Sequence, residues 1–574
     1  MRLKRYCFGL YELAMLTVVA GASLLRAILT SAHWPFANSD EGFMDLMASH
    51  IAFRGERPVF FYGQAYMGPV EAYVGAVCFR LFGISVFSLR LGVIAFFALF
   101  LICMYFLTRL LYTRRLALAT VLLLGLGSSE VVSHQLKAIG GYPELPLFAA
   151  LILLLASKLA LSSHPRLTPF TTGQRWLRRL AFGLLGFLMG FSFWIDQLIF
   201  PFVLAAILLV LFFCWRELRL WAGFSLILGV LLGAWPLIQY NLHALPGQTT
   251  LASLQKINAV GYKTMSTGHI PVVRQLVGAV LFSLPAMTGL NPLCSAENFP
   301  LFGPTTTSTA RCVAMHGAWA GGYLLLWGLA AAMAGLVIWR QWRQTAVRSW
   351  SFEQRETVIR QTARLMLLMG AMLTLITFVI TPTAAFASND RYLTCTLMAA
   401  PALLWPLWNG LHPRKLFSLS PSTLVHLIRI SIIALVFAMF ANGAVQIFTE
   451  VPAAIASYNQ QNDLIEHLLN IGATRFYTDY WTCSRLIFQS DERLICSSVS
   501  ESLNPDPALD RYQPYRTIMM HAARPSYVFA IGTASGLRQA RNFERKSHRL
   551  HIHYQLYRFD GCAVYVPAVR FSLL

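Results

Sequence analysis

Long apolar runs recur along this chain and constrain its fold more than any other feature. Four of the clearest are residues 145–161, 220–237, 323–339 and 428–445. Each approaches the roughly 20 residues that cross a bilayer as a helix, and a helix satisfies its own backbone hydrogen bonds there. Only 12% of the residues are charged, about half the share found in soluble domains. The sequence therefore predicts a polytopic membrane protein.

Basic residues gather in short segments between the apolar runs and account for the net charge of +21. This is the positive-inside pattern of membrane proteins, so nucleic acid is not an expected partner. Residues 1–5 are basic and precede an apolar run from 9 to 29 without a small-residue cleavage site, which predicts an uncleaved first helix with its N-terminus in the cytoplasm. The basic positions expected inside are Arg109, Arg114, Arg115, Arg166, Arg175, Arg178, Arg179, Arg216, Arg219, the 340–364 loop and residues 412–415.

Two apolar stretches, residues 66–83 and 275–290, decide the orientation of the later spans. Stretch 66–83 contains Glu71, Arg80 and several glycines, which favours an interfacial or re-entrant helix. If neither stretch crosses, the basic clusters fall inside. If both cross, the early clusters fall outside, against the rule. We therefore expect about eleven spans rather than about thirteen, and either count places the C-terminus outside.

The predicted fold is an all-α transmembrane bundle followed by a smaller α/β domain. Residues 1–450 form the membrane domain, with a first outer loop at 31–66 and a long outer region at 241–317. Residues 451–574 have a soluble composition, and alternating helix and strand patterns predict an extracytoplasmic α/β domain. Its expected elements are helices at 462–470 and 516–523 and strands at 474–479, 493–499 and 526–531.

The ten cysteines show no CxxC motif and no zinc-ligand spacing. Cys294 and Cys312 flank one expected outer loop. An oxidising compartment would allow them to form a disulfide, but spacing alone does not decide whether they pair.

The first outer loop contains the acids Asp40 and Glu41 directly after Asn38 and Ser39. A carboxylate at the membrane surface, shielded by apolar helices, can act as a general base. The structural alternative is a helix start, in which Asn38 or Ser39 caps the helix and the acids favour its positive end. The spacing of these residues favours neither the general base nor the helix cap.

A later outer loop ends in Arg391 and Tyr392, where a span is expected to begin. An arginine can clamp a phosphate through two parallel hydrogen bonds. The alternative is an arginine that snorkels to lipid head groups beside an interfacial tyrosine. By itself the pair favours this second interpretation.

Five further polar residues are candidates for substrate contact. Asp196 ends a span and can simply be hydrated there, and His134 and Glu144 lie on a turn that can equally be an ordinary surface turn. Tyr66 and Glu71 come at the end of the first outer loop. The sequence contains no P-loop, HExxH or GxSxG motif, which leaves ATP-driven and serine-hydrolase chemistry without support.

In order along the chain, four short motifs resemble the GT-C class of membrane glycosyltransferases. They are Ser39–Glu41, then 83–85 with 89–91 (Gly-Ile-Ser and Leu-Arg-Leu), then Arg391–Tyr392, and finally 477–481 (Tyr-Thr-Asp-Tyr-Trp). The nearest resemblance is to bacterial relatives of protein O-mannosyltransferases and of the lipid A aminoarabinose transferase. It covers nearly the whole chain and depends on order and topology more than on any single motif.

The resemblance implies a polyprenyl-phosphate-sugar donor and a hydroxyl acceptor on a lipid, glycan or protein, in the cytoplasmic membrane. It implies that Asp40 is the base, supported by Glu41, and that Arg391 and Tyr392 bind the donor phosphate. Relatives often have a glutamate before the proline that ends the first loop, whereas Glu71 follows Pro69 here, so its role is not carried over. Members differ in needing a divalent cation, and both alternatives stay open.

The main alternative function is a membrane transporter or lipid flippase. It would require paired ionisable groups deep in several spans, but Arg26 is the clearest mid-span charge and no partner is evident in the sequence. A membrane scaffold is a second alternative. The transferase interpretation requires Asp40 and Arg391 on the same outer face, which the eleven-span topology provides.

Overall fold

A computed structural model describes residues 9–163, 172–263, 272–344, 350–411, 421–505, 509–559 and 561–568. Arg166 and residues 412–415, which were predicted to face the cytoplasm, are not among the described residues. The chain divides into two compact units. The helical unit comprises Met1–Ala27, Val93–Leu136 and Gly141–Thr449, and the mixed unit comprises Ile28–Gly92, Lys137–Gly140 and Glu450–Leu574.

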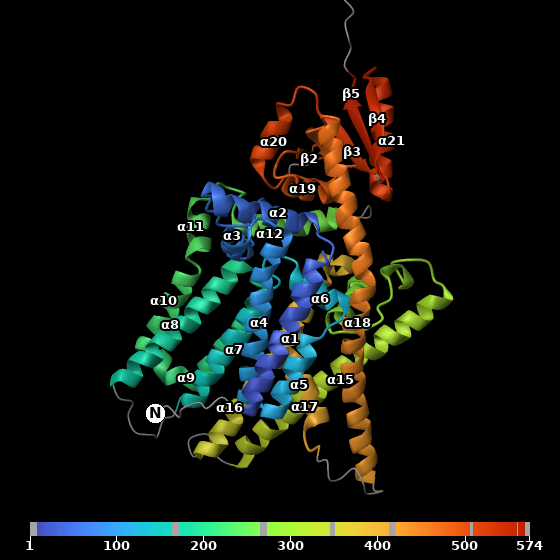
Figure 1. Ribbon diagram of the computed structural model, residues 1–574. Coiled ribbons are helices and arrows are strands. Elements are labelled where there is room, and N and C mark those ends of the chain that lie inside the picture. The colour runs from blue at the N-terminus through green and yellow to red at the C-terminus, as the bar shows by residue number, and fades with distance from the viewer. Residues whose placement is uncertain are drawn as a thin grey trace, which may run out of the picture. The chain divides into compact units, whose positions relative to one another are not determined.

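The helical unit contains many long apolar helices, and α7, α8, α9 and α16 run alongside one another within it (Figure 1). Its helices, two of which continue into the mixed unit at one end, are α1 Leu10–Ser31, α4 Val86–Leu111, α5 Arg114–Gly125, α6 Ser129–Leu136, α7 Leu145–Ser162, α8 Thr172–Ile195, η2 Gln197–Ile199, α9 Phe200–Leu218, α10 Trp221–Gly233, α11 Trp235–His243, α12 Thr250–Lys263, α13 Val272–Leu276, η3 Val277–Ser283, α14 Leu284–Met287, η4 Ala296–Asn298, α15 Thr307–Gln344, α16 Phe352–Val379, η6 Pro382–Ala385, η7 Ala387–Ala399 and α17 Ala400–Trp408. A further helix, α18 Pro421–Asn470, continues from this unit into the mixed unit.

Among the described residues, eight helices are long and apolar enough to cross a membrane, or ten if two bent pairs each count as one span. The pairs α5–α6 and α10–α11 bend by 85° and 59°. This count is lower than the eleven spans preferred from the sequence. The stretch after Arg391 explains part of the difference, because it continues as the 3-10 helix η7 and then as the nine-residue α17.

The two stretches expected not to cross form short helices. Residues 70–82 form α3, which has 13 residues, about 20 Å at 1.5 Å per residue. Residues 272–287 form another short apolar helix. The 340–364 region is mostly helical rather than a loop, because α15 extends to Gln344 and α16 begins at Phe352. The last helical turn of α15 and the first turns of α16 contain arginines, such as Arg343 and Arg355, beyond the apolar segments of these helices.

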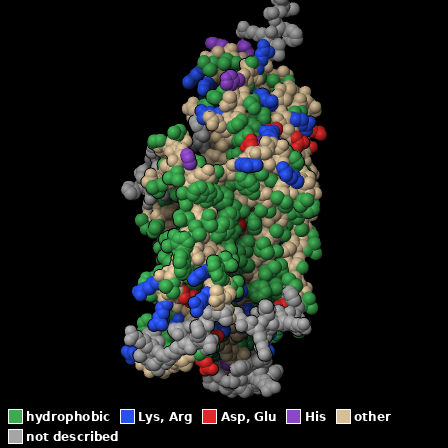
Figure 2. All heavy atoms as spheres, turned by 90° about the vertical axis from the view of Figure 1, so that its left-hand side faces the viewer, with side chains coloured by type: hydrophobic (Ala, Val, Ile, Leu, Met, Phe, Trp, Pro, Cys, Tyr) green, Lys and Arg blue, Asp and Glu red, His purple; other side chains and the backbone are tan. Residues whose placement is uncertain are grey.

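Figure 2 shows hydrophobic side chains covering the middle of the helical unit, with lysine and arginine gathered at one end of its helices. Exposed apolar side chains of α8, α9 and α10 include Leu180, Leu184, Phe187, Phe212, Phe224, Ile227 and Leu231. Because α8 begins at Thr172 and α9 ends at Leu218, the exposed Arg175, Arg216 and Arg219 share one end. An apolar belt with a basic rim is the surface expected of a helix bundle in a bilayer.

Arg26 is buried in the helical unit but is not unpartnered. It donates to the carbonyl oxygen of Gly125 at 2.9 Å and to Gln135, and its guanidinium lies 3.6 Å from the ring centroid of Phe97. These partners are neutral, so this residue does not form the ion pair that the transporter alternative requires.

The mixed unit contains a five-stranded sheet in the order β2-β1-β3-β5-β4. The strand β1 lies between β2 and β3 and is parallel to both, whereas β5 is antiparallel to its neighbours β3 and β4. Its elements are α2 Ser39–Ser49, η1 His50–Arg54, α3 Val70–Phe82, β1 Arg475–Thr478, α19 Tyr480–Gln489, β2 Ile495–Ser498, α20 Gln513–Met520, β3 Ser526–Ala530, α21 Ala534–Arg549, β4 Tyr554–Phe559 and β5 Cys562–Pro567.

The expected α/β character of the C-terminal part is confirmed, and its three predicted strands match β1, β2 and β3. The predicted helix at 516–523 lies at 513–520 instead, and 462–470 is the end of α18. The strands β4 and β5 were not predicted. One reason is that β4 is an edge strand whose residues are mostly exposed or half-buried, including Gln555 and Arg558, so it lacks a clear apolar alternation.

Two disulfides are present. Cys294 and Cys312 pair in the helical unit, which settles the alternative left open by their spacing. Cys483 of α19 pairs with Cys496 of β2 in the mixed unit, and this second bond was not predicted.

Candidate functional site

The helix α2 begins where it does because Asn38 caps it. The Asn38 side-chain oxygen accepts the backbone N–H of Glu41 at 3.0 Å, which satisfies one of the free donors of the first turn. Asp40 and Glu41 then occupy that turn, where the positive end of the helix favours acids. The capping interpretation is therefore confirmed. It does not exclude a chemical role for either acid.

Glu41 is fully buried and forms a two-pronged ion pair with Arg90, which is 1% exposed. Arg90 Nε lies 2.8 Å from Oε1, and Nη2 lies 2.7 Å from Oε2. Arg90 also donates to the carbonyl oxygen of Pro35 at 2.8 Å. The Leu-Arg-Leu motif at 89–91 thus supplies the partner of the acid next to Asp40. This pair fixes the start of α2 against the start of α4.

Asp40 is held by two residues from the C-terminal part of the same unit. The Tyr480 hydroxyl donates a short hydrogen bond to Asp40, and Arg511 Nη2 lies 2.7 Å from its Oδ1. The Asp40 side chain is 8% exposed. Tyr480 belongs to the motif at 477–481, whereas Arg511 lies in a loop without any motif. No sequence motif points to Arg511, because it lies 471 positions after Asp40 in a chain of 574 residues.

The helices α2 and α19 pack closely around this acid. Ser39 Oγ donates to the carbonyl oxygen of Tyr480 at 2.5 Å, and Ser484 Oγ donates to that of Ser39 at 2.8 Å. A Cβ on Gly42 would lie 2.8 Å from Ser484 Oγ and 3.0 Å from the Arg485 backbone nitrogen. A side chain at this position would therefore push α19 away from α2.

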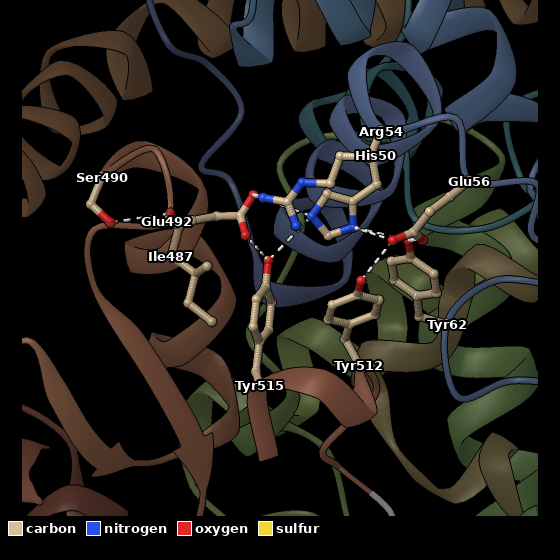
Figure 3. A network of polar contacts seen from close by, with 9 residues as sticks. All are labelled: His50, Arg54, Glu56, Tyr62, Ile487, Ser490, Glu492, Tyr512 and Tyr515. Atoms are coloured by element: carbon tan, nitrogen blue, oxygen red, sulfur yellow. Dashed lines mark hydrogen bonds and ion pairs between the residues drawn. The ribbon is translucent and has the colours of Figure 1, made fainter. Parts of the chain in front are cut away.

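A second polar network links the end of α2 to the C-terminal part (Figure 3). His50 is fully buried, and its Nε2 lies 3.2 Å from Glu492, which also pairs with Arg54 and accepts the Tyr515 hydroxyl at 2.9 Å. Burial raises the pKa of Glu492, but hydrogen bonds from His50, Arg54 and Tyr515 outweigh it and lower that pKa to about 2.

The same network includes a second glutamate. Glu56 accepts hydrogen bonds from the hydroxyls of Tyr62 and Tyr512, the latter at 2.7 Å, and Tyr62 in turn lies 3.0 Å from His50 Nδ1. Burial, and then the hydrogen bond to Glu56, raises the pKa of Tyr512 to about 12. The network therefore contains two carboxylates and neutral tyrosines, and it anchors the segment between α2 and α3.

The other candidates of the first loop differ in their surroundings. Glu71 is buried in the first turn of α3 and accepts the backbone N–H of Gly140 at 2.8 Å. Tyr66 is half-buried in the turn that precedes α3. Asp45, one turn beyond Glu41, is also buried, and its pKa is well above the ordinary value because of burial and the nearby charge of Glu41, which outweigh Arg90.

In the helical unit, the structure brings together residues from two distant segments. His134 Nε2 lies 3.1 Å from Asp390 Oδ1. The next residue, Arg391, has its guanidinium 5.4 Å from the ring centroid of Tyr142 and 5.7 Å from that of Tyr392. The 3-10 helix η7 carries residues 390–392, and α6 carries His134. A cation between aromatic faces beside an imidazole suits an anionic group.

Glu130, His134 and Asp390 are grouped closely enough to hold a metal ion, with their ligand atoms all within 4.8 Å of one another. The set of two carboxylates and one imidazole fits a divalent cation. Asp390 was not among the predicted site residues, although it directly precedes Arg391.

Asp196 and Glu144 belong to the same unit. Asp196 is 5% exposed and caps η2, with its Oδ1 accepting the Leu198 N–H at 2.9 Å. Burial raises its pKa to about 7, against that hydrogen bond. It lies against Gly141, whose missing Cβ would be 3.2 Å from the Asp196 Cβ. Glu144 is fully buried. The alternative that Asp196 is simply hydrated at the end of a span does not agree with its burial.

No family model matches the sequence, and no curated protein matches it. Solved structures do match. ArnT from Cupriavidus metallidurans bound to undecaprenyl phosphate is similar over 97% of this chain and 98% of that one, with a TM-score of 0.52 and 13% identity. The oligosaccharyltransferase from Archaeoglobus fulgidus tethered with an acceptor peptide is similar over 98% of this chain and 74% of that one, also with a TM-score of 0.52 and 13% identity.

ArnT, a lipid A aminoarabinose transferase, and the oligosaccharyltransferase are both GT-C glycosyltransferases. The similarity covers nearly the whole of this chain, so the chain has the GT-C fold. The resemblance seen in the short sequence motifs is confirmed at the level of the fold.

Proposed function

We propose that this protein transfers a sugar from a polyprenyl-phosphate donor to a hydroxyl group on a lipid, glycan or protein. The observation that carries the proposal is the full-length similarity to ArnT bound to undecaprenyl phosphate. Transfer takes place at the outer face of the cytoplasmic membrane, with the N-terminus inside. Residues 451–574 form the outer domain, and residues 1–450 form the membrane domain. The basic rim of the helical unit supports this orientation.

In the proposed reaction, the acceptor oxygen attacks the anomeric carbon while the bond from that carbon to the phosphate oxygen breaks. The leaving phosphate keeps the bonding electrons, the acceptor proton passes to Asp40, and the anomeric configuration inverts. A positioned base contributes typically 10²–10⁴-fold to such a step. Because Asp40 is buried beneath Arg511 and Tyr480, the proposal requires the Arg511 loop to move aside when the acceptor binds.

Glu41 is a positioning residue in this scheme. Its buried ion pair with Arg90 fixes the first turn of α2, and thereby the direction of the Asp40 side chain. This role agrees with the supporting function that the resemblance implies.

Arg391 and Tyr392 are proposed to bind the donor phosphate. The nearby His134 adds a hydrogen-bonding group, and Glu144 and Asp196 are proposed to contact the substrate, as are Tyr66 and Glu71. A cation bound by Glu130, His134 and Asp390 would place a further positive charge near the departing phosphate.

The helical unit also offers space for an isoprenoid chain. An apolar cavity of about 320 Å³ is lined by residues that include Leu123, Trp319, Leu397 and Phe440. Leu397 belongs to η7, the same helix that carries Arg391. This supports a donor whose phosphate and lipid tail are bound by neighbouring residues.

The test is to incubate membranes containing the protein with radiolabelled polyprenyl-phosphate sugars and to measure label in lipid, glycan and protein fractions. We expect transfer from at least one donor, absent in membranes without the protein. Absence of transfer from the full donor set, with folded protein present, would contradict the proposal. Identifying the glycan lost when the protein is deleted selects the donors to include.

A further inference from the structure

The helix α21, Ala534–Arg549, packs against the strand β3 of the mixed unit (Figure 1). Its buried residues, Gly536, Gln539, Ala540 and Phe543, recur every three or four positions. They therefore cover one side of the helix, as in any amphipathic helix packed on a sheet. The opposite side faces away from the sheet.

That outward side carries a row of arginines. Arg538, Arg541, Arg545 and Arg549 follow one another at intervals of three and four residues, so they are neighbours on the helix surface. All four are exposed. The other residues that share this side are polar, namely Asn542 and His548. No apolar side chain interrupts the row.

Most of this charge is not balanced by acids. Among the described residues, Arg538 alone in the row has an acid partner, Glu501, at 2.7 Å. Arg545 donates to the neutral side chain of Asn542 at 2.9 Å. Arg541 and Arg549 form no ion pair with any described residue. The row therefore presents three uncompensated positive charges to solvent.

The fold does not explain the whole row. The negative end of a helix favours cations in its last turn, which accounts for Lys546 and Arg549 but not for Arg541 in the middle. Like charges four residues apart destabilise a helix. Glu544 of the same helix accepts the hydroxyl of Tyr565 at 2.7 Å and does not pair with the row. A bound anion would relieve the repulsion.

The chemistry of the row distinguishes among anionic partners. Helices that bind a lipid surface insert an apolar face, but the apolar face of α21 is buried on the sheet. The centre of a stable protein interface is depleted of charge, and single-stranded nucleic acid is bound by aromatic stacking. The row offers neither an apolar centre nor an aromatic ring.

A linear glycan with an acidic group on each sugar fits the row better. An arginine binds a carboxylate through two parallel hydrogen bonds. Four residues of helix rise about 6 Å, close to the length of one sugar ring, so successive arginines can meet successive sugars. We propose that α21 binds an acidic polysaccharide through Arg541, Arg545 and Arg549. The proposal goes beyond the transferase function, because it concerns binding alone and holds whether or not Asp40 acts as the base.

Binding can be measured by fluorescence anisotropy with the full chain in phosphatidylcholine nanodiscs, which carry no net charge. The probes are labelled oligomannuronate, neutral dextran of the same length and polyglutamate of the same charge. We expect oligomannuronate to bind and dextran not to bind. The binding should weaken as salt is added, because salt screens exposed charges.

The test variant is Arg541→Gln/Arg545→Gln/Arg549→Gln. The matched control removes the same charge from exposed positions elsewhere in the unit, as Arg57→Gln/Arg493→Gln/Arg524→Gln. The test variant should bind oligomannuronate at least about tenfold more weakly, because three exposed charge contacts are lost together. The control should bind like the wild-type chain. Both variants should unfold near the wild-type temperature, since the substituted side chains are exposed.

Four results would overturn the proposal. The first is no binding of oligomannuronate at low salt, and the second is an equal loss of binding in the test and control variants. Tighter binding of polyglutamate would assign the row to an acidic protein segment. Loss of oligomannuronate binding in nanodiscs that contain phosphatidylglycerol would assign it to the lipid surface. None of these results depends on sugar transfer.

Discussion

The buried pair of Glu41 and Arg90 makes the most quantitative prediction. In Glu41→Gln, Arg90 keeps its charge at 1% exposure but loses the carboxylate that balances it. Removing one partner of a buried ion pair typically costs about 3–5 kcal/mol, because an uncompensated charge stays buried. For a unit of this size, each kcal/mol lowers the melting temperature by about 2–4 °C. The expected decrease is roughly 6–20 °C.

The assay is thermal unfolding of the purified chain in nanodiscs, followed by tryptophan fluorescence. The matched control is Arg538→Ala, which breaks the exposed pair with Glu501, where the side chains are 56% and 47% exposed. Water and salt screen an exposed pair of this kind, so it contributes little to stability and this control should unfold close to the wild-type temperature. The double variant Glu41→Leu/Arg90→Leu should recover part of the loss, because it leaves no unpaired charge.

A decrease below about 2 °C for Glu41→Gln would refute the reasoning. Such a result would mean that water or another group compensates Arg90. The start of α2 would then not depend on this ion pair, and Glu41 would lose its positioning role beside Asp40.

Three further outcomes are expected. Arg391→Ala should raise the donor KM about tenfold or more, and an unchanged dependence on donor concentration would make Arg391 a head-group anchor. Gly42→Ala should cost about 1–3 kcal/mol of stability, whereas Gly321→Ala, whose Cβ would meet nothing within 4 Å, should cost none; equal unfolding temperatures would argue against the close packing of α2. The folded-state pKa of Glu492 is about 2, below the ordinary 4.5, so its stabilisation is present above pH 4.5 and is lost as the pH falls toward 2. Melting curves at pH 6 and pH 3 should show that loss in the wild-type chain but not in Glu492→Gln.

Local features of the fold could be read from the sequence. Asn38 followed by two acids predicted a capped helix start, and the apolar runs predicted the membrane helices. The strands β1 and β2 were found because their apolar residues stand out in a polar region. These signals depend on residues close together in the chain.

The partners of the candidate site could not be read in the same way. Glu41 and Arg90 are 49 residues apart, and Asp40 and Tyr480 are 440 apart. Neither spacing nor composition reveals contacts at such separations. The number of spans stays a prediction, because length and composition alone give eight candidate helices among the described residues, or ten if the bent pairs at 114–136 and 221–243 each count as one span.

The most direct test of the proposed transferase is the rate of Asp40→Asn with a radiolabelled polyprenyl-phosphate sugar. The matched control is Asp45→Asn on the same helix. Burial and the nearby charge of Glu41 raise the pKa of Asp45 well above the ordinary value, so Asp45→Asn removes less negative charge than the same change at a carboxyl group with an ordinary pKa. The account predicts a 10²–10⁴-fold loss for Asp40→Asn and near-normal transfer for Asp45→Asn. Near-normal turnover in folded Asp40→Asn would remove this carboxylate from the reaction.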